Sequence, residues 1–228
     1  MKKKAIVLVS GGMDSALTAA FAFKKYELAF LHLNYGQLTQ KRELKAFNDI
    51  ADYYGVKHRL VESIKYLSDI GGSALTDKKI KVEKANLKSK KVPSTYVPFR
   101  NANLLSIAVS WAEVIGAERI YIGAVEEDSS GYPDCRKSFY DAFNEVIRIG
   151  TKNNSKIKIV TPIIKYSKDD IVKLSVKMES PLHLTWSCYK SNTLACGECD
   201  SCALRLRGFQ SAGYEDPIKY KKIISYIR

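Results

Sequence analysis

Four of the five cysteines lie close together near one end of the sequence, while Cys135 stands apart. The clustered residues, spaced C-x7-C-x2-C-x2-C, are Cys188, Cys196, Cys199 and Cys202. Two successive C-x2-C steps can turn thiolates toward one ion, and a cysteine from the preceding loop can complete the set. Four sulfur ligands with no open position are typical of a structural zinc site, so we expect one zinc ion there.

The rival interpretations of this cluster are an iron–sulfur centre and free thiols. The ferredoxin pattern continues with a fourth cysteine after three residues and then proline, whereas Ala203 to Leu206 follow in this sequence. The spacing therefore favours zinc over iron. Cys135 has no histidine near it in the sequence, which favours a structural thiol over a nucleophile. His32, His58 and His183 share no ligand spacing, and we expect structural or surface roles for all three.

A glycine-containing segment, Ser10 to Ser15 (SGGMDS), follows a short apolar run and precedes a helix pattern. Two glycines let the backbone approach a ligand and expose its N–H groups to an anion. Ser10 and Ser15 can add hydroxyl donors, and the helix directs its positive end at the same place. Asp14 would either hold a magnesium ion that phosphates share or cap the helix. We interpret the segment as a phosphate-binding loop; the alternative is a turn with no ligand.

This loop is neither a Walker P-loop nor a GxGxxG motif. It resembles the pyrophosphate loop of the N-type ATP pyrophosphatases, which implies cleavage of ATP between its α and β phosphates and transfer of AMP to an oxygen of the substrate. The expected ATP-binding residues are Val9, Ser10, Gly11, Gly12, Met13, Asp14, Ser15 and Ala16.

Other charged residues occur at places where ligands bind. Arg100 precedes a helix pattern, and its guanidinium could bind a phosphate or a carboxylate, or lie on the surface. Asp134 and Arg136 belong to a polar loop after a strand and could recognise a heterocycle and a carboxylate; a capped turn is the alternative. Lys165 also follows a strand and could reach a phosphate.

Apolar periodicity places these residues on a regular framework. Strands are expected over residues 5–9, 28–33, 59–61, 119–123 and 157–160, and helices over 16–23, 44–54, 104–115, 139–147 and from Ser167 onward. Strands that alternate with helices predict a doubly wound α/β fold with a mainly parallel sheet. We expect an α/β domain over residues 1–184 and a zinc-bound segment over 185–228 packed on it.

Composition limits the partners and the compartment. The 228 residues carry 37 Lys and Arg against 24 Asp and Glu, and the net charge of +13 predicts an anionic partner. Seven lysines lie in residues 71–94, which we expect to form a mobile surface loop; they are residues 78, 79, 81, 84, 88, 90 and 91. The apolar run of residues 5–9 is shorter than the roughly 7–15 residues of a signal core. No stretch approaches the roughly 20 apolar residues of a membrane span, so we expect a cytoplasmic protein.

Six segments in order along the chain resemble the 7-cyano-7-deazaguanine synthase family of the queuosine precursor pathway. They are SGGMDS at 10–15, YGQ at 35–37, VPFRN at 97–101, SGYPDCR at 130–136, Thr161-Pro162 with Lys165, and TWSCY at 185–189 with the three later cysteines. SGYPDCR and TWSCY with the three later cysteines are more specific to this family than the SGGMDS loop alone. Phe99 departs from the family, which more often has glycine there; this leaves the shape of the pocket wall at that position open, though not the class of enzyme.

The resemblance implies an adenine-nucleotide α-hydrolase-like fold and an ATP-dependent ligase that uses magnesium and one structural zinc. The implied reaction turns 7-carboxy-7-deazaguanine and ammonia into 7-cyano-7-deazaguanine through an adenylated carboxylate, an amide and its dehydration. Asp14, Ser15, Arg100 and Lys165 would serve catalysis at the phosphates. Tyr132, Asp134 and Arg136 would orient the deazaguanine.

Two other functions remain open from the sequence. A tRNA-modifying ATP pyrophosphatase, which adenylates a tRNA base, would suit the positive charge and the lysines. A zinc-knuckle module that binds nucleic acid would suit the cysteines but not the phosphate loop. We expect small-molecule substrates, no stable nucleic-acid complex, no membrane association and possibly a homodimer.

Overall fold

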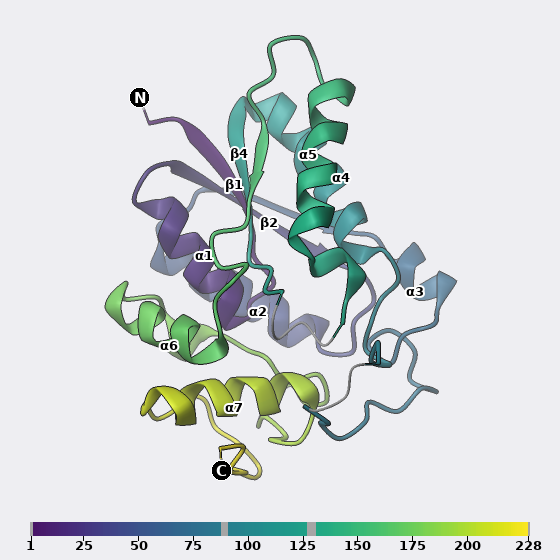
Figure 1. Ribbon diagram of the computed structural model, residues 1–228, viewed down its shortest axis with the longest axis vertical. Coiled ribbons are helices and arrows are strands. Elements are labelled where there is room, and N and C mark those ends of the chain that lie inside the picture. Colours follow the sequence, from purple (N-terminus) through teal and green to yellow (C-terminus); the bar gives the residue numbers. More distant parts are fainter. Residues whose placement is uncertain (1, 88–90, 127–130, 228) are drawn as a thin grey trace.

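The computed structural model describes residues 2–87, 91–126 and 131–227. Within these residues, five parallel strands form one sheet in the order β3-β2-β1-β4-β5 (Figure 1). The strands are β1 (Lys4–Leu8), β2 (Glu27–Asn34), β3 (His58–Ser63), β4 (Ala117–Ile122) and β5 (Lys158–Val160). Strands β2 and β3 extend the sheet on one side of β1, and β4 and β5 extend it on the other. The direction of winding therefore reverses between β1 and β4, which is where doubly wound sheets bind ligands.

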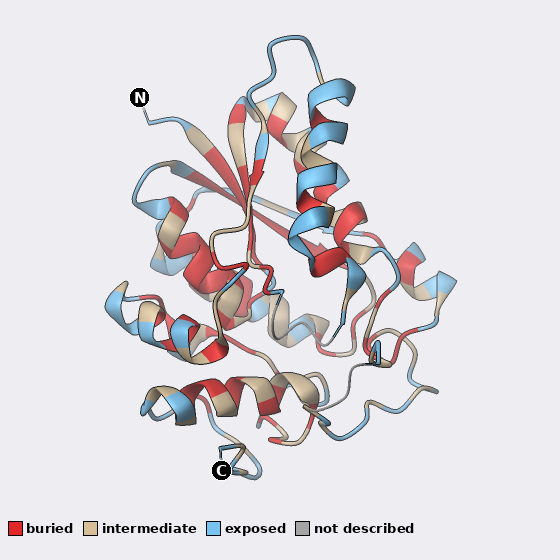
Figure 2. Ribbon diagram, in the orientation of Figure 1, coloured by how far each residue is buried: buried red, intermediate tan, exposed pale blue. Residues whose placement is uncertain are grey.

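Helices cover both faces of this sheet. They are α1 (Met13–Phe23), α2 (Gln40–Tyr53), α3 (Tyr66–Ile70), α4 (Arg100–Ile115), α5 (Lys137–Gly150), α6 (Lys168–Lys177) and α7 (Asp200–Ala212). Ala5, Val7 and Val9 pack with α1 and α2, whereas Ile6 and Leu8 pack with α4 and α5. Strand β1 is thus buried on both faces, as the red central strands of Figure 2 show. This double burial explains why its sequence is continuously apolar instead of alternating.

The predicted doubly wound fold is confirmed, and each predicted strand and helix is present with shifted ends. Helix α1 begins at Met13 and α4 at Arg100, several residues before the apolar pattern indicated. The start of α6 is confirmed in detail, because Ser167 Oγ accepts from the Asp170 N–H and the Asp170 carboxylate accepts from the Ser167 N–H. Sequence periodicity did not predict α7, which lies inside the segment assigned to the cysteines.

Helices α6 and α7 lie side by side at the edge of the α/β layers (Figure 1). A side chain at Gly208 of α7 would meet the Lys168 carbonyl oxygen at 2.9 Å, so glycine allows this close approach. Leu17 of α1, Ile171 of α6 and Phe209 of α7 share one apolar cluster. The C-terminal segment is packed on the preceding layers, while the domain boundary at residue 185 stays a prediction. Among the described residues, no helix combines the length and the apolar character needed to cross a bilayer.

The lysine-rich segment is attached to the body of the protein at several points. The Ala74 N–H donates to the Ser94 carbonyl at 2.8 Å, and Ser73 and Ala74 are buried at the base of the segment. Farther along, the Ala85 N–H donates to the Glu198 carbonyl at 2.9 Å. The exposed lysines are residues 78, 79, 81, 84 and 91, whereas 88 and 90 lie outside the described residues. The segment exposes lysines as expected, but it is tied to the cysteine-containing region.

Candidate active site

A cavity of about 290 Å³ opens at the carboxyl ends of β1 and β4, at the switch point of the sheet. The loop after β1 forms one wall, and Gly123, directly after β4, forms another. The first residues of α4 and of α7 form further parts of the cavity wall. The fold therefore gathers the phosphate loop and residues distant from it in sequence around one space.

The SGGMDS loop adopts the form that a phosphate cradle requires. Gly11 has a φ of +91°, and a side chain there would meet the Glu43 carbonyl oxygen at 2.8 Å. Glycine is thus needed both for the turn and for the space. Ser10 Oγ accepts from the Gly12 N–H at 3.3 Å, and Ser15 Oγ donates to the Gly12 carbonyl at 2.9 Å. Because α1 begins at Met13, the positive end of that helix faces the cavity.

The end of β4 lies against this loop. A side chain at Gly123 would come within 2.9 Å of the Asp14 carbonyl oxygen, so the two segments touch through their backbones. The absence of a side chain there keeps the cavity open beside the loop.

Asp14 forms an ion pair with Lys168 across this wall. Lys168 Nζ lies 2.7 Å from Asp14 Oδ2, and the lysine side chain is only 9% exposed. The other oxygen, Oδ1, is buried without a hydrogen-bond partner among the described residues. A hard carboxylate oxygen left unpaired beside a phosphate loop fits a magnesium ligand.

The structure brings Lys168, and not Lys165, to the cavity. Lys165 is exposed and does not line it, whereas Lys168 does. Helical periodicity is the signal that could have found Lys168, because it precedes the buried Ile171 and Val172 by three and four residues. A lysine on the buried face of a helix needs a partner, and Asp14 supplies it.

The segments around residues 97–101 and 131–136 meet at the start of α4. Asp134 is buried, and its Oδ2 accepts from the Asn101 N–H at 3.0 Å. Asn101 Nδ2 donates to the Asp134 carbonyl at 2.9 Å and approaches Cys135 Sγ at 3.4 Å. Burial and the neighbouring Asp134 raise the pKa of Cys135 to about 11, which keeps the thiol protonated and suits the structural role predicted for it.

The three predicted substrate residues have different surroundings. Tyr132 lines the cavity and shares a hydrogen bond of 2.7 Å with Thr95 Oγ1. Asp134 does not line the cavity and holds α4 in place, while Arg136 is exposed and also outside the lining. Their roles toward substrate stay predictions. Ser130, the first residue of the SGYPDCR segment, lies outside the described residues.

Arg100 is the first residue of α4 and extends into the cavity wall. Its Nη1 donates to the Tyr35 hydroxyl at 3.2 Å, and its guanidinium carbon lies 5.3 Å from the centre of the Tyr35 ring. Phe99 directly before it is 62% exposed and does not line the cavity. The departure from the family at Phe99 therefore lies outside the cavity lining. Its φ of +55° is a left-handed conformation, which explains why glycine suits the position.

The histidines differ in environment. His32 is buried and lines the cavity, with Nδ1 2.9 Å from the Val9 carbonyl oxygen and its ring against Phe47. His58 is exposed, 3.7 Å from Glu27 at the surface. Structural and surface roles agree with these contacts.

The four clustered cysteines have converged. Their sulfur atoms all lie within 4.8 Å of one another, and Cys196 Sγ is 3.9 Å from Cys202 Sγ. The N–H groups of Lys190 and Cys196 point at Cys188 Sγ, each at 3.3 Å. Thiolates accept such donors, so the cluster can hold a metal ion. Next to it, the Trp186 N–H donates to the Gly11 carbonyl at 2.8 Å and connects the cysteine segment to the phosphate loop.

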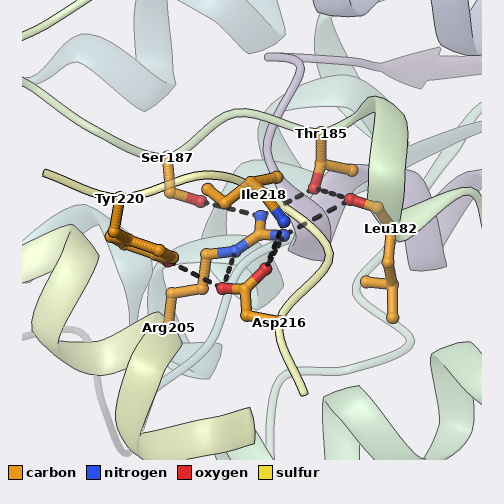
Figure 3. A network of polar contacts seen from close by, with 7 residues as sticks. All are labelled: Leu182, Thr185, Ser187, Arg205, Asp216, Ile218 and Tyr220. Atoms are coloured by element: carbon orange, nitrogen blue, oxygen red, sulfur yellow. Dashed lines mark hydrogen bonds and ion pairs between the residues drawn. The ribbon is translucent and has the colours of Figure 1, made fainter. Parts of the chain in front are cut away.

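A second arginine, the buried Arg205 of α7, organises the C-terminal segment (Figure 3). Nε and Nη2 bind the two oxygens of Asp216 at 2.7 and 2.9 Å. Nη1 donates to Thr185 Oγ1 at 2.6 Å and approaches Ser187 Oγ at 3.3 Å. Sequence analysis did not single out Arg205, because nothing local to α7 marks it as buried.

Comparison with known proteins agrees with the sequence motifs. A family model described as queuosine biosynthesis protein QueC matches residues 4–213. Proteins named 7-cyano-7-deazaguanine synthase from Chlorobium phaeobacteroides and Chloroherpeton thalassium are each 58% identical over 225 residues, covering 98% of this chain and 100% of theirs. The NH3-dependent NAD synthetase from Campylobacter jejuni superposes with a TM-score of 0.46 at 13% identity, over 81% of this chain and 67% of that one, and we infer nothing from it. The chain belongs to the QueC family of queuosine biosynthesis proteins.

Proposed function

We propose that this protein converts 7-carboxy-7-deazaguanine and ammonia into 7-cyano-7-deazaguanine with ATP. The observation that carries the proposal is the single cavity that joins a pyrophosphate-type loop to a wall of tyrosines and a buried arginine. Membership of the QueC family and the names of its close relatives support this reaction over the modification of a tRNA base.

The chemistry requires two activations of the same carbon. A carboxylate is a poor electrophile, so its oxygen first takes AMP from ATP while pyrophosphate leaves. Ammonia then attacks the carbon and AMP leaves, which yields an amide. A second transfer of AMP to the amide oxygen turns that oxygen into a leaving group, and its loss with two N–H protons yields the nitrile. Charge builds on phosphate oxygens in both transfers, so fixed cationic and N–H groups lower the barrier.

The residues of the loop suit those needs. Its backbone N–H groups, Ser10 and Ser15 would bind the phosphates, and Asp14, with one unpartnered oxygen, would hold magnesium. Bound magnesium would supply positive charge to the phosphates. Lys168 would neutralise the pyrophosphate as it forms, the role that the sequence suggested for Lys165. The ion pair with Asp14 keeps the lysine in the cavity wall.

We propose that the cysteine cluster holds one zinc ion. A tetrahedral ion with bonds of about 2.3 Å to sulfur separates its sulfur atoms by roughly 3.8 Å. The separation of 3.9 Å between Cys196 and Cys202 supports a single ion, because an iron–sulfur cluster places its cysteines on separate iron atoms. Four sulfur ligands leave no open position, so this ion would stabilise the fold and take no part in catalysis.

The partners and the compartment belong to the same proposal. We place the enzyme in the cytoplasm, with small molecules as substrates and no stable nucleic-acid complex, and possibly as a homodimer. Salt-resistant binding of tRNA would instead favour the tRNA-modifying alternative, since contacts to phosphates alone weaken steeply with salt.

The test is a direct assay. Protein, ATP, magnesium, ammonium and 7-carboxy-7-deazaguanine are incubated, and the products are identified by mass spectrometry. We expect the amide and then the nitrile, together with AMP and pyrophosphate. Cleavage of ATP with neither product would overturn the proposal.

Two matched lysine variants assign the phosphate cation in the same assay. Lys168→Met should lower kcat roughly 100-fold, the effect of losing one group that stabilises charge in the transition state. Lys165→Met should change it much less, because that side chain is exposed and outside the cavity. A larger loss in Lys165→Met would restore the assignment made from sequence. Circular dichroism of both variants checks that the fold is intact.

A further inference from the structure

Arg100 is half-buried, with a buried Nε, and its guanidinium has almost no partners among the described residues. Within the described residues, its one hydrogen bond is to the Tyr35 hydroxyl, and no carboxylate forms an ion pair with it. Its Nε is buried without any acceptor. An isolated buried charge is costly, and proteins rarely keep one unless something neutralises it. The cavity that Arg100 lines is therefore suited to an anionic ligand.

Among the described residues no carboxylate forms an ion pair with Arg100, although Asp14, Glu43 and Asp200 line the same cavity. Four tyrosines line the same cavity: Tyr35, Tyr132, Tyr140 and Tyr189. Burial raises the pKa of Tyr35 to about 12 and also raises the pKa of Tyr132 and of Tyr140, so these three are neutral phenols near pH 7. Arg100 also stands at the start of the 16-residue helix α4, whose N-terminal end favours a negative charge.

Two anions enter this cavity under the proposed function, and the phosphates already have a receptor. The loop after β1 offers N–H groups, two serine hydroxyls and Lys168. Arg100 lies instead with aromatic side chains, which suit a flat heterocycle through stacking. An arginine fork also matches a planar carboxylate in shape, through two parallel hydrogen bonds.

We propose that Arg100 is the receptor for the carboxylate of the planar heteroaromatic acid, with the tyrosines holding the ring. This inference rests on the proposed function. The guanidinium binds the carboxylate through these two hydrogen bonds, and one carboxylate oxygen uses a remaining lone pair to attack the α-phosphorus of ATP. A new oxygen–phosphorus bond forms as the bond to pyrophosphate breaks, and pyrophosphate leaves with that electron pair. Arg100 is thus a specificity residue for the acid, distinct from the phosphate-binding groups.

This role separates the two halves of the reaction. The acid is an anion, whereas the amide formed from it is neutral. Arg100 should therefore matter greatly for binding the acid and much less for converting the amide. A group that binds the phosphates of ATP would affect both halves equally, since each half uses ATP.

The experiment compares Arg100→Met and Arg100→Lys with wild type, and uses Arg148→Met, an exposed arginine of α5, as the matched control. Release of pyrophosphate is measured against the acid, against ATP, and against the pre-formed amide. Arg100→Met should raise the KM for the acid roughly 10- to 100-fold, the effect of losing hydrogen bonds to a charged group. For the same variant, the KM for ATP and the turnover of the amide should each change by less than about threefold. Arg100→Lys should recover part of the loss for the acid.

Thermal unfolding gives a second readout that a purely structural arginine would not match. Because Arg100 has no anionic partner among the described residues, Arg100→Met should keep or raise the melting temperature. The inference would be overturned if Arg100→Met raised the KM for ATP instead of the KM for the acid. Equal losses of activity with the acid and with the amide would also overturn it. If wild type makes no nitrile, the proposed function fails on its own. Calorimetric titration of the acid and of 7-deazaguanine, which lacks the carboxylate, still tests Arg100: loss of the preference for the acid in Arg100→Met supports the inference, and its retention refutes it.

Discussion

Two arginines line the same cavity, Arg205 buried and Arg100 half-buried, and their surroundings differ sharply. Arg205 binds both oxygens of Asp216 and also reaches Thr185, Ser187 and the Leu182 carbonyl (Figure 3). Within the part of the chain that the structure describes, Arg100 has a single hydrogen bond, to Tyr35. Since both arginines are at least partly withdrawn from solvent, burial alone does not distinguish structure from function. The number of hydrogen bonds that the protein itself supplies does.

Arg205, the arginine with many hydrogen bonds, joins three segments that are separate in sequence. Asp216 also accepts from the Tyr220 hydroxyl at 2.7 Å and from the Ile218 N–H at 3.2 Å, so the C-terminal tail is fixed to α7. Thr185 and Ser187 flank Trp186, whose N–H binds Gly11 of the phosphate loop. Arg205 thus holds the wall of the cavity in place, while Arg100 remains available to a ligand. Each prediction below tests one side of this difference.

The largest effect is expected from removal of the proposed zinc ion, in the C-terminal region around Arg205. Cys202→Ser takes away one of four ligands, and structural zinc contributes on the order of 10 kcal/mol to small domains. We expect loss of bound zinc and local unfolding of the C-terminal segment, measured by elemental analysis and by hydrogen exchange. Cys135→Ser is the control and should keep its zinc, because Cys135 lies outside the cluster. Full protection from exchange in a zinc-free Cys202→Ser protein would show that the segment is held by Arg205 alone.

Breaking the Arg205 pair should come next in size. Asp216→Ala leaves a guanidinium buried without its carboxylate, which typically costs about 3–5 kcal/mol of unfolding free energy. Denaturation in urea measures the loss. The double variant Arg205→Met/Asp216→Leu should recover most of it, since apolar residues of similar volume remove the unpaired charge. If Asp216→Ala costs as little as Arg100→Met, the contrast between the two arginines is wrong.

The smallest expected effect lies next to Arg100. Phe99→Gly should raise the unfolding free energy by up to about 1 kcal/mol, because glycine adopts a positive φ without the clash of a side chain. The gain is limited by the loss of the contact between the rings of Phe99 and Phe139 and by the greater freedom of glycine in the unfolded chain. The KM for the acid should not change, since Phe99 does not line the cavity. A changed KM would show that strain at Phe99 positions Arg100.

Sequence patterns were informative wherever the cause of a structure is local. The apolar run before Ser10 predicted a strand buried on both faces, and the cysteine spacing predicted four converging sulfur atoms; both are confirmed. Ser167 and Asp170 predicted the start of α6 because their hydrogen bonds join neighbouring residues. The patterns were weaker for α7, where cysteine spacing and a glycine obscured the apolar periodicity.

The lysine near the phosphates shows where local patterns stop. Lys165 follows a strand and was the natural choice, yet Lys168 reaches Asp14, which lies 154 residues earlier in the chain. Lys165 lies in the turns before α6, whereas Lys168 is the first residue of that helix, so the choice depends on how α6 packs against α1. A local sequence pattern does not predict how a helix is oriented, because the orientation depends on the other elements that pack against the helix.

By itself, the sequence determined the alternation of strands and helices, the phosphate loop and the metal-binding set of cysteines, because each depends on residues close together in the chain. Only the tertiary structure decided which charges are satisfied. Arg205 meets Asp216 and the loop at 182–187, whereas Arg100 meets tyrosines, and this difference follows from how distant segments pack. The free energy of a buried charge depends on its partners, and those are supplied by the whole fold.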